Sequence, residues 1–499
     1  MRILLTKLTT SRFLKWLLIP IALFALLRAP SLIEPYWYGD EGIYQVIGQA
    51  LAQGKQLYID IWDNKPPLLY IFYAIASGDQ LVMRTASFLF GIVSVIVFGL
   101  LAKLLFKDGK TALLCTGLFA FLFGSPLVEG NIANAENFMI LPTLICAFLL
   151  YQQVTKASSF ININKHLLFL IGVIMGTVFL IKTVALFDVL AFGLFISIFG
   201  HISFKKVPHR IFVIQLIKTL IPLYCGFIIP TAIALLYYFT ISALPEFINA
   251  AFLGNVSYVE FENSLWGVPH GLLYLKIVLL IATIASIFIF AKSLPHHVLF
   301  IVLWLAFAVF STAFSGRPYT HYLLLSVPAF CLLVGIIIAS KTMIIKIISG
   351  AMVLLLLYIA SYYSVSPSKA LYYYSNTVSF LRGTISNDTY RAFFDQTTPR
   401  DYELASLLSA ITDPGDQVYI WGDHPQIYAL SNIEVPTRYV VAYHIVPSKE
   451  RIQETQEQLN TIKPRFVVLL DEAQPLPFDL SLYIIRYRID GAAIYERVN

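Results

Sequence analysis

Long apolar runs separated by short polar segments dominate the chain up to Tyr363. Many of these runs approach the ~20 residues that an α-helix needs to cross the hydrocarbon core of a bilayer. Eleven membrane helices are predicted on this basis, at residues 13–33, 80–102, 111–128, 137–153, 166–181, 184–200, 219–241, 271–291, 296–314, 322–340 and 343–363. The pattern therefore predicts a polytopic α-helical membrane protein.

The pattern changes after Tyr363, where charged residues become frequent and apolar runs shorten to strand length. Short β-rich runs bounded by turn residues favour strands, and longer amphipathic runs favour helices. Strands are predicted at 418–421, 439–445, 466–470 and 482–489, and helices at 401–411 and 448–461. Alternating strands and helices indicate a small α/β layer domain. We therefore predict a membrane domain over 1–363 and a C-terminal extracytoplasmic α/β domain over 364–499.

No glycine fingerprint or phosphate-binding loop occurs in the C-terminal segment, so the sequence assigns it no chemistry of its own. Its loop Trp421-Gly-Asp-His-Pro425 is aromatic and charged and is a candidate to face a membrane site. The simpler interpretation is a strand-to-helix turn in which Asp423 caps the following helix, because aspartate is a preferred capping residue.

Composition supports the membrane assignment, since only 13% of the residues are charged and 58% are hydrophobic, whereas soluble domains carry about 25% charged residues. The net charge of +6 comes from basic residues scattered between apolar runs. That distribution is typical of topology signals and not of a nucleic-acid-binding surface. No disulfide or zinc site is indicated, because all of the cysteines lie inside apolar runs without close pairing: Cys115, Cys146, Cys225 and Cys331.

The basic clusters also orient the helices, because cytoplasmic loops concentrate lysine and arginine. They place the N-terminus in the cytoplasm and the loops 34–67, 126–137 and 242–270, with everything after residue 364, outside. The first apolar run lacks a small-residue cleavage site and is expected to remain as a membrane helix. The predicted location is the inner (plasma) membrane.

The first external loop, residues 34–67, mixes carboxylates, a lysine and aromatic rings. Asp40 and Glu41 stand at its head, and Lys65-Pro66-Pro67 stands at its end. Aromatic rings lie at headgroup depth in membrane proteins, and charges there meet polar ligands. This composition indicates a site at the membrane surface.

These motifs and their order resemble the GT-C glycosyltransferases, specifically bacterial relatives of protein O-mannosyltransferases and lipid A aminoarabinose transferases. The resemblance rests on four matches: Asp40-Glu41, Lys65-Pro66-Pro67, Arg84-Thr-Ala-Ser-x-x-x-Gly91, and Ala133-Asn134-Ala135-Glu136-Asn137 in a second short external loop. The chain departs from the aminoarabinose transferases at Ile43, where they have a basic residue, and at Asn64, where they have an acidic one. Sugar and acceptor identity are therefore not transferred from that subgroup.

The resemblance implies transfer of a sugar, without a nucleotide and with inversion, from a polyprenyl-phosphate carrier to a lipid, glycan or protein acceptor on the outer face of the membrane. Asp40 is the expected general base, sharing catalytic and helix-capping roles with Glu41. Lys65 is the expected phosphate anchor, the alternative being a lysine that reaches for the membrane interface. Glu136 is expected to complete the site or to hold a divalent cation with Asp40.

Five further residues are candidate substrate contacts on the outer side. Lys182 interrupts two apolar runs and is either a second phosphate contact or a helix-end lysine reaching headgroups. Arg317, Tyr319 and His321 share one tight loop and are candidates to contact phosphate or sugar hydroxyls, although His321 is more simply an interfacial histidine. Arg84 is a substrate contact or the ion-pair partner of Asp79.

Two other classes of protein compete with this interpretation: a membrane transporter, and a structural or assembly subunit, which would need no essential acidic residue. The nearest rival is another enzyme. A lipid-linked oligosaccharide ligase or polymerase would also use an outer lipid-phosphate site, but we expect it to rely on a large external loop. A membrane transporter would place charges near helix midpoints in paired halves, and no internal repeat of that kind occurs. The polar residues lie at the outer helix ends, which favours the glycosyltransferase.

Overall fold

The computed structural model describes residues 11–157, 160–203, 208–255, 263–264, 270–471 and 476–498. The chain divides into two compact units. The first, called here the helical unit, contains Met1–Ser31, Ala86–Ile241 and Gly254–Leu371. The second, called here the mixed unit, contains Leu32–Thr85, Ser242–Leu253 and Tyr372–Asn499. The first external loop thus shares a compact unit with the C-terminal segment.

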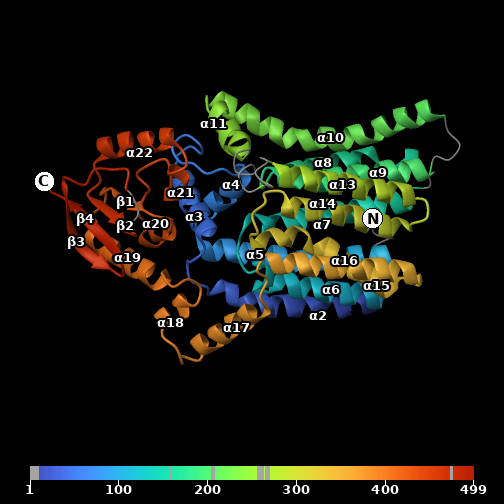
Figure 1. Ribbon diagram of the computed structural model, residues 1–499, viewed down its shortest axis with the longest axis horizontal. Coiled ribbons are helices and arrows are strands. Elements are labelled where there is room, and N and C mark those ends of the chain that lie inside the picture. The colour runs from blue at the N-terminus through green and yellow to red at the C-terminus, as the bar shows by residue number, and fades with distance from the viewer. Residues whose placement is uncertain are drawn as a thin grey trace. The chain divides into compact units, whose positions relative to one another are not determined.

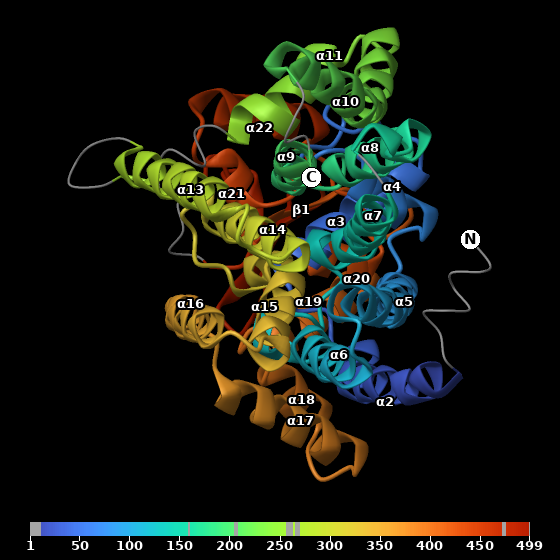
Figure 2. The ribbon, with the colours of Figure 1, turned by 90° about the vertical axis from the view of Figure 1, so that its right-hand side faces the viewer.

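Roughly parallel helices run through the helical unit (Figure 1), and Figure 2 shows several of them end-on. The long helices are α2 (Ser11–Arg28), α5 (Gln80–Phe106), α7 (Ala135–Lys156), α9 (Ala185–Ser203), α10 (His209–Thr240), α13 (Gly271–Phe290), α14 (His296–Ala313) and α16 (Met343–Tyr362). Shorter apolar helices are α6 (Gly109–Gly124), α8 (Lys165–Phe179) and α15 (Val327–Ala339).

Within the described residues, eight helices are long and apolar enough to cross a membrane. Each of the stretches predicted from sequence contains a helix. Three of these helices are shorter than a bilayer-spanning helix, because α6, α8 and α15 have 16, 15 and 13 residues. The predicted class, a polytopic helical membrane protein, is confirmed. The total of eleven spans stays a prediction.

Small residues allow a close contact between α8 and α10 in the helical unit. A Cβ added to Gly172 would lie 2.1 Å from the carbonyl oxygen of Leu223, and one added to Gly226 would lie 2.2 Å from that of Phe169. In lipid, helix association depends on such close backbone approach, because the hydrophobic effect is absent there. These glycines therefore hold the two helices together.

The mixed unit places a four-stranded sheet among short helices. The strands are β1 (Val418–Trp421), β2 (Phe466–Leu469), β3 (Tyr483–Ile489) and β4 (Ala492–Arg497). Their order is β1-β2-β4-β3, in which β1 and β2 are parallel with Val418 opposite Phe466, and the other pairs are antiparallel. The helices are α3 (Gly39–Ala52), α4 (Leu68–Ile75), α11 (Leu244–Ile248), α18 (Asn387–Ala392), α19 (Thr398–Ile411), α20 (Gln426–Ser431), α21 (Ala442–Ile445) and α22 (Lys449–Ile462), and α17 (Pro367–Leu381) begins in the helical unit.

The predictions for the C-terminal segment are confirmed for three strands and both helices, and they are wrong in three places. Residues 439–445 form no strand, because only Tyr439 makes a bridge and the chain then turns into α21; a short buried apolar run has no periodicity that separates helix from strand. Strand β4 was missed, although the turn Asp490-Gly491 before it, with φ of 40° and 81°, is a hairpin signal. Asp423 is no helix cap, since its carboxylate accepts from the backbone N–H of Tyr443 at 3.0 Å.

Candidate active site

Helix α3 carries the predicted acidic pair in its first turn. The residue before it, Tyr38, is extended and gives no side-chain cap, so the helix begins one residue before Asp40 and the predicted capping role of Asp40 is wrong. Acidic side chains in a first helical turn are stabilised by the helix dipole. The carboxylate of Asp40 accepts a hydrogen bond from the hydroxyl of Tyr44 at 3.2 Å and remains partly exposed.

Lys65 lies at the other end of the loop, directly before Pro66 and Pro67 and the start of α4. Its ammonium is 3.7 Å from Asp40 Oδ1 and 3.6 Å from Asp63 Oδ2, and it lies 5.0 Å from the centre of the Tyr44 ring. Helices α3 and α4 pack together closely. The structure thus brings the two ends of the loop, predicted to share a site, into one cluster.

Asp63 is the centre of that cluster and is buried. Its carboxylate accepts from the hydroxyl of Tyr70 at 2.5 Å and from the backbone N–H of Asn64 at 2.7 Å. Burial and the nearby Asp63 charge raise the pKa of Tyr70 well above its usual value, so the phenol remains a donor. Asp63 therefore holds one side of Lys65 in a fixed place.

His444 of α21 also meets Asp63, with Nε2 at 3.5 Å from Oδ1. Burial lowers the pKa of His444 to about 4, against a smaller opposing effect of Asp63, so the ring is neutral at pH 7. Its ring packs edge-on against Trp62, over which the Arg451 guanidinium lies at 4.0 Å. Arg451 is a second cation of this neighbourhood.

Sequence reasoning missed His444, Arg451 and the central role of Asp63. Asp63 had a signal, because it is acidic, lies two residues before Lys65 and belongs to the charged loop. His444 and Arg451 had none, since they lie in a segment more than 370 residues after the loop, and only tertiary packing brings that segment back to it.

Glu41 and Arg84 form a separate buried pair. Arg84 Nη2 is 2.7 Å from Glu41 Oε2, and the side chains are 2% and 1% exposed. Gln80 donates to the same oxygen at 2.8 Å, and Arg84 also donates to the carbonyl of Glu34 at 2.7 Å. The alternative pairing of Arg84 with Asp79 is wrong, because the Asp79 carboxylate accepts from the backbone N–H of Val82. This pair joins the start of α5 to the first turn of α3.

The remaining predicted residues gather in the helical unit, in what we call the Glu136 cluster: Glu129, Glu136, Lys182, Arg317, Tyr319, His321 and Tyr322. Glu136 lies in the first turn of α7, is buried and forms an ion pair with Lys182. The Lys182 ammonium also lies 4.1 Å from the centre of the Tyr322 ring.

His321 lies in the loop after α14, with Nδ1 at 3.0 Å from Glu129 Oε2. Its ring stacks on Tyr319 at 5.7 Å between centres, and the Tyr319 hydroxyl accepts from Arg317 at 3.3 Å. Glu129 was not predicted; it has a left-handed backbone, with φ of 55°. The Glu136 cluster thus combines three basic side chains with two carboxylates: Lys182, His321 and Arg317 with Glu129 and Glu136.

The predicted divalent cation pairs Asp40 with Glu136, which belong to different units of the chain. Among the residues that the structure describes, no three histidine, cysteine or acidic side chains come together as metal ligands would. Metal dependence therefore stays a prediction.

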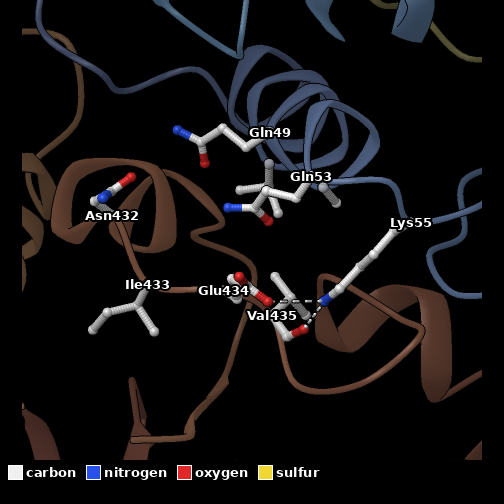
Figure 3. A pocket seen from close by; sticks show the side chains of 9 residues that line it. Gln49, Gln53, Lys55, Asn432, Ile433, Glu434 and Val435 are labelled. Carbon is white, nitrogen blue, oxygen red and sulfur yellow. Dashed lines mark hydrogen bonds and ion pairs between the residues drawn. The ribbon is translucent and has the colours of Figure 1, made fainter. Parts of the chain in front are cut away.

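The other end of α3 is anchored to the segment after α20 beside a small hollow (Figure 3). Lys55 donates to the carbonyl of Val435 at 2.9 Å and lies 3.7 Å from Glu434 Oε2. Gln49 of α3 and Gln53, the residue directly after α3, line the same hollow. These contacts hold α3 at both ends, which fixes the direction of its acidic first turn.

Comparison with known proteins shows which family model and which solved structures this chain is similar to. Residues 54–244 match the family model described as dolichyl-phosphate-mannose-protein mannosyltransferase. A curated relative, dolichol phosphate-mannose mannosyltransferase of Haloferax volcanii, is 39% identical over 71 residues, which are 13% of this chain and 15% of the relative. The match therefore spans a small part of that protein's length.

Two solved structures of ArnT from Cupriavidus metallidurans share the fold over nearly the whole chain. The structure bound to undecaprenyl phosphate has a TM-score of 0.52 at 13% identity and covers 98% of both chains. The apo structure has a TM-score of 0.53 at 14% identity and covers 97% of this chain and 98% of that one. The predicted resemblance is confirmed: residues 54–244 match the dolichyl-phosphate-mannose-protein mannosyltransferase family model, and the chain shares the fold of ArnT over nearly its whole length.

Proposed function

We propose that this protein is a glycosyltransferase that moves one sugar from a polyprenyl-phosphate donor to an acceptor outside the cytoplasm. The observation that carries the proposal is the Asp40–Lys65 contact in the first external loop, at 3.7 Å, at the edge of the matched family domain. The relative's name, which specifies a dolichol-phosphate sugar, and the lipid bound by ArnT support a polyprenyl-phosphate donor. The protein lies in the inner membrane with the N-terminus in the cytoplasm and this loop outside.

Asp40 acts as the general base in a single inverting displacement. An acceptor hydroxyl oxygen forms the new bond to the anomeric carbon while the bond from that carbon to the phosphate oxygen breaks. The hydroxyl proton passes to Asp40, and the polyprenyl phosphate leaves with the electron pair of the broken bond. Partial exposure of Asp40 supports this role, because a base must reach its substrate.

Lys65 binds the phosphate of the donor and of the departing lipid. In the resting structure its charge is divided between Asp40 and Asp63. When Asp40 takes up the proton, it becomes neutral, and more of the Lys65 charge is then available to the phosphate as negative charge develops there. Proton transfer and departure of the lipid are coupled in this way through one ammonium group.

Glu41 and Arg84 take a positioning role in this mechanism, since both side chains are buried in a pair that fixes the first turn of α3. The cations of the Glu136 cluster, above all Lys182 and Arg317, are proposed as further contacts to anionic or hydroxyl groups of the substrates. The acceptor class that the family suggests is a hydroxyl-bearing lipid, glycan or protein.

The proposal is tested by complementation of a strain that lacks this chain. Asp40→Asn is expected to lower the yield of the glycosylated product about 10²- to 10⁴-fold, the usual contribution of a general base. Asp60→Asn is the matched control, because Asp60 lies in the same loop, is exposed and bonds the backbone N–H of Gln56. The product is measured by mass spectrometry of glycolipids and glycoproteins, and membrane levels of each variant by immunoblot. Normal product with Asp40→Asn would reject the base.

The donor side is tested by binding of undecaprenyl phosphate to the purified protein. Lys65→Met should weaken binding about 10- to 100-fold, which corresponds to one lost hydrogen bond to a charged group. Lys55→Met is the control, since Lys55 forms its ion pair with the exposed Glu434 at the far end of α3. Equal affinity of the Lys65 variant and the wild type would refute the phosphate contact.

A further inference from the structure

A second histidine–aspartate pair lies in the mixed unit, in the loop Trp421-Gly-Asp-His-Pro425 between β1 and α20. His424 Nδ1 is 2.7 Å from Asp401 Oδ2. Asp401 is fully buried and also accepts from Gln426 Nε2 at 2.9 Å and, at its other oxygen, from Arg400 Nη2 at 3.0 Å. The carboxylate thus holds the imidazole ring from inside the protein.

The other ring nitrogen of His424 lies on the accessible side. The His424 side chain is 26% exposed, and the described residues make no hydrogen bond to its Nε2. An aspartate bound at Nδ1 selects the tautomer that carries its proton there, so that Nε2 is left as a hydrogen-bond acceptor. The pair therefore presents one oriented acceptor atom at the surface.

The loop that carries His424 is held in place on several sides. Gly422 has φ of 151°, and a Cβ there would lie 2.6 Å from the side chain of Leu470, just beyond β2. The Gly422 carbonyl accepts from the backbone N–H of Ala442 at 3.0 Å. The loop follows the carboxyl end of β1, which is parallel to β2, and this edge of a parallel sheet is where ligands commonly bind.

The same loop packs against the first turn of α3, the turn that carries Asp40. A Cβ added to Gly42 would lie 3.0 Å from the backbone nitrogen of Gln426, and one added to Gly39 would lie 4.0 Å from the carbonyl oxygen of Asp423. The absence of a Cβ at Gly42 allows this close approach, whereas the contact at Gly39 has an ordinary van der Waals distance. The loop of His424 and the first turn of α3 are therefore adjoining segments.

Partly exposed aromatic rings occur beside these segments. Trp37, which precedes α3, packs against Phe394 with ring centres 5.7 Å apart. Asp395 follows Phe394, has an exposed side chain and lies near His424. Partial burial opposes ionisation of its carboxyl group, but hydrogen bonds from Thr397 and the charges of His424 and Arg400 together lower the pKa of Asp395 below its usual value. Carboxylates thus flank the histidine on a surface that also offers aromatic faces.

We propose that His424, oriented by Asp401, binds a hydroxyl group of a carbohydrate acceptor next to Asp40. The inference rests on the proposed function and names its acceptor class. Neutral imidazole accepts from a hydroxyl donor, and aromatic faces such as Trp37 pack on the apolar face of a sugar ring. The nearby carboxylates of Asp395 and Asp401 disfavour a phosphate, which separates this position from the donor phosphate at Lys65. Asp401 is a positioning residue, because it acts through His424.

Two substitutions of His424 distinguish a ligand-binding role of this residue from a purely structural one. In His424→Asn the amide nitrogen takes the position of Nδ1, which keeps the bond to Asp401 and removes Nε2. In His424→Gln the amide group reaches the position of Nε2 and restores a hydrogen-bonding atom there. A structural histidine is thus replaced better by asparagine, and a ligand-binding histidine is replaced better by glutamine. His166→Asn is the matched control, since His166 is exposed on α8.

The assay uses the full-length protein in proteoliposomes with a radiolabelled polyprenyl-phosphate lipid extract as donor. Two acceptor probes come from the envelope of a strain lacking the chain: its delipidated saccharide fraction and its protein fraction. With the saccharide fraction, His424→Asn and Asp401→Asn should raise the concentration that gives half-maximal rate about three- to tenfold, the effect of one lost hydrogen bond. The maximal rate should change little, and His424→Gln should recover most of the affinity.

Three results would overturn the inference. A wild-type response of His424→Asn would show that Nε2 contacts no acceptor. Recovery by asparagine and not by glutamine, with lowered thermal stability of the glutamine variant, would show a structural histidine. Asp40-dependent transfer to the protein fraction alone would exclude the carbohydrate acceptor. An absence of Asp40-dependent transfer to either fraction would overturn the proposed function as well, and so the two failures are distinguishable.

Discussion

Removal of Glu41 should destabilise the protein without abolishing the chemistry that Asp40 performs. Glu41→Ala leaves the guanidinium of Arg84 buried, at 2% exposure, and removes the carboxylate that lies 2.7 Å from its Nη2. Breaking a buried pair from one side costs about 3–5 kcal/mol. Arg84 keeps hydrogen bonds to the carbonyls of Glu34 and Pro35, so we expect about 3 kcal/mol, the lower end of that range.

The double variant Glu41→Met/Arg84→Met tests the same reasoning from the other side. Replacing a buried ion pair by apolar residues of similar volume is often neutral or stabilising, because no charge remains to be desolvated. We therefore expect the double variant to recover most of the stability that Glu41→Ala loses. The measurement is thermal unfolding of the purified protein in detergent, followed by tryptophan fluorescence. We expect the unfolding temperature to decrease from the wild type to the double variant and then to the single variant.

Transfer activity separates positioning from catalysis. The double variant, once folded, should retain transfer within about tenfold of the wild type, whereas Asp40→Asn should lose about 10²- to 10⁴-fold at unchanged stability. A double variant as stable as the wild type but as inactive as Asp40→Asn would refute the positioning role and make Glu41 catalytic. A single variant with unchanged unfolding temperature would refute the buried pair.

Three further predictions concern the packing around Asp63 and α3. Tyr70→Phe removes the 2.5 Å hydrogen bond to the buried Asp63 carboxylate and should lower the unfolding free energy by about 2 kcal/mol, measured by denaturant titration. His444 has a pKa of about 4 in the folded protein, against an ordinary value of 6.5. Between these values the unfolded chain binds a proton that the folded protein does not, so the free energy of unfolding should fall by about 3 kcal/mol as pH drops from about 6.5 to 4. His444→Phe should reduce this pH dependence in thermal scans. Gly48→Ala places a Cβ 2.7 Å from Tyr73 and should destabilise by about 1–3 kcal/mol in the same scans.

Each of these predictions has a control and a contradicting result. Tyr237→Phe, on an exposed side chain, and Gly117→Ala, where a Cβ meets nothing within 4 Å, should leave stability nearly unchanged. An equal loss of unfolding free energy in Tyr70→Phe and Tyr237→Phe would contradict the hydrogen bond to Asp63. Equal unfolding temperatures of Gly48→Ala and Gly117→Ala would contradict the close packing of α3 on α4. A pH slope unchanged in His444→Phe would assign the acid sensitivity to other groups.

The candidate site shows how far pairs of residues near in sequence can be predicted. Asp40 and Lys65 lie in one loop between two apolar runs, and a loop whose ends enter the same membrane face brings them near each other. The same reasoning could not assign different roles to Asp40 and Glu41. Neighbouring side chains on a helix point about 100° apart, and the sequence does not show which of the two directions faces the site. Only the position of Arg84 on α5 decided that Glu41 points into the protein.

Residues distant in sequence were found only by the fold. Nothing in the sequence links Asp63 to His444 or Asp40 to the loop of His424, because these contacts depend on how the C-terminal segment packs on α3 and its loop. The apolar run 439–445 illustrates the same limit, since its turn into α21 depends on the contacts of Tyr439 and Ala442 with other segments.

The sequence by itself determined the membrane class, the approximate helices and the loop that carries Asp40 and Lys65. These features follow from hydrophobic length and charge distribution, which act locally along the chain. The tertiary structure alone decided which carboxylate faces a cation, which one is buried with Arg84, and which C-terminal histidines join the loop. Those outcomes depend on burial and on contacts between distant segments, and a linear pattern of residues does not contain that information.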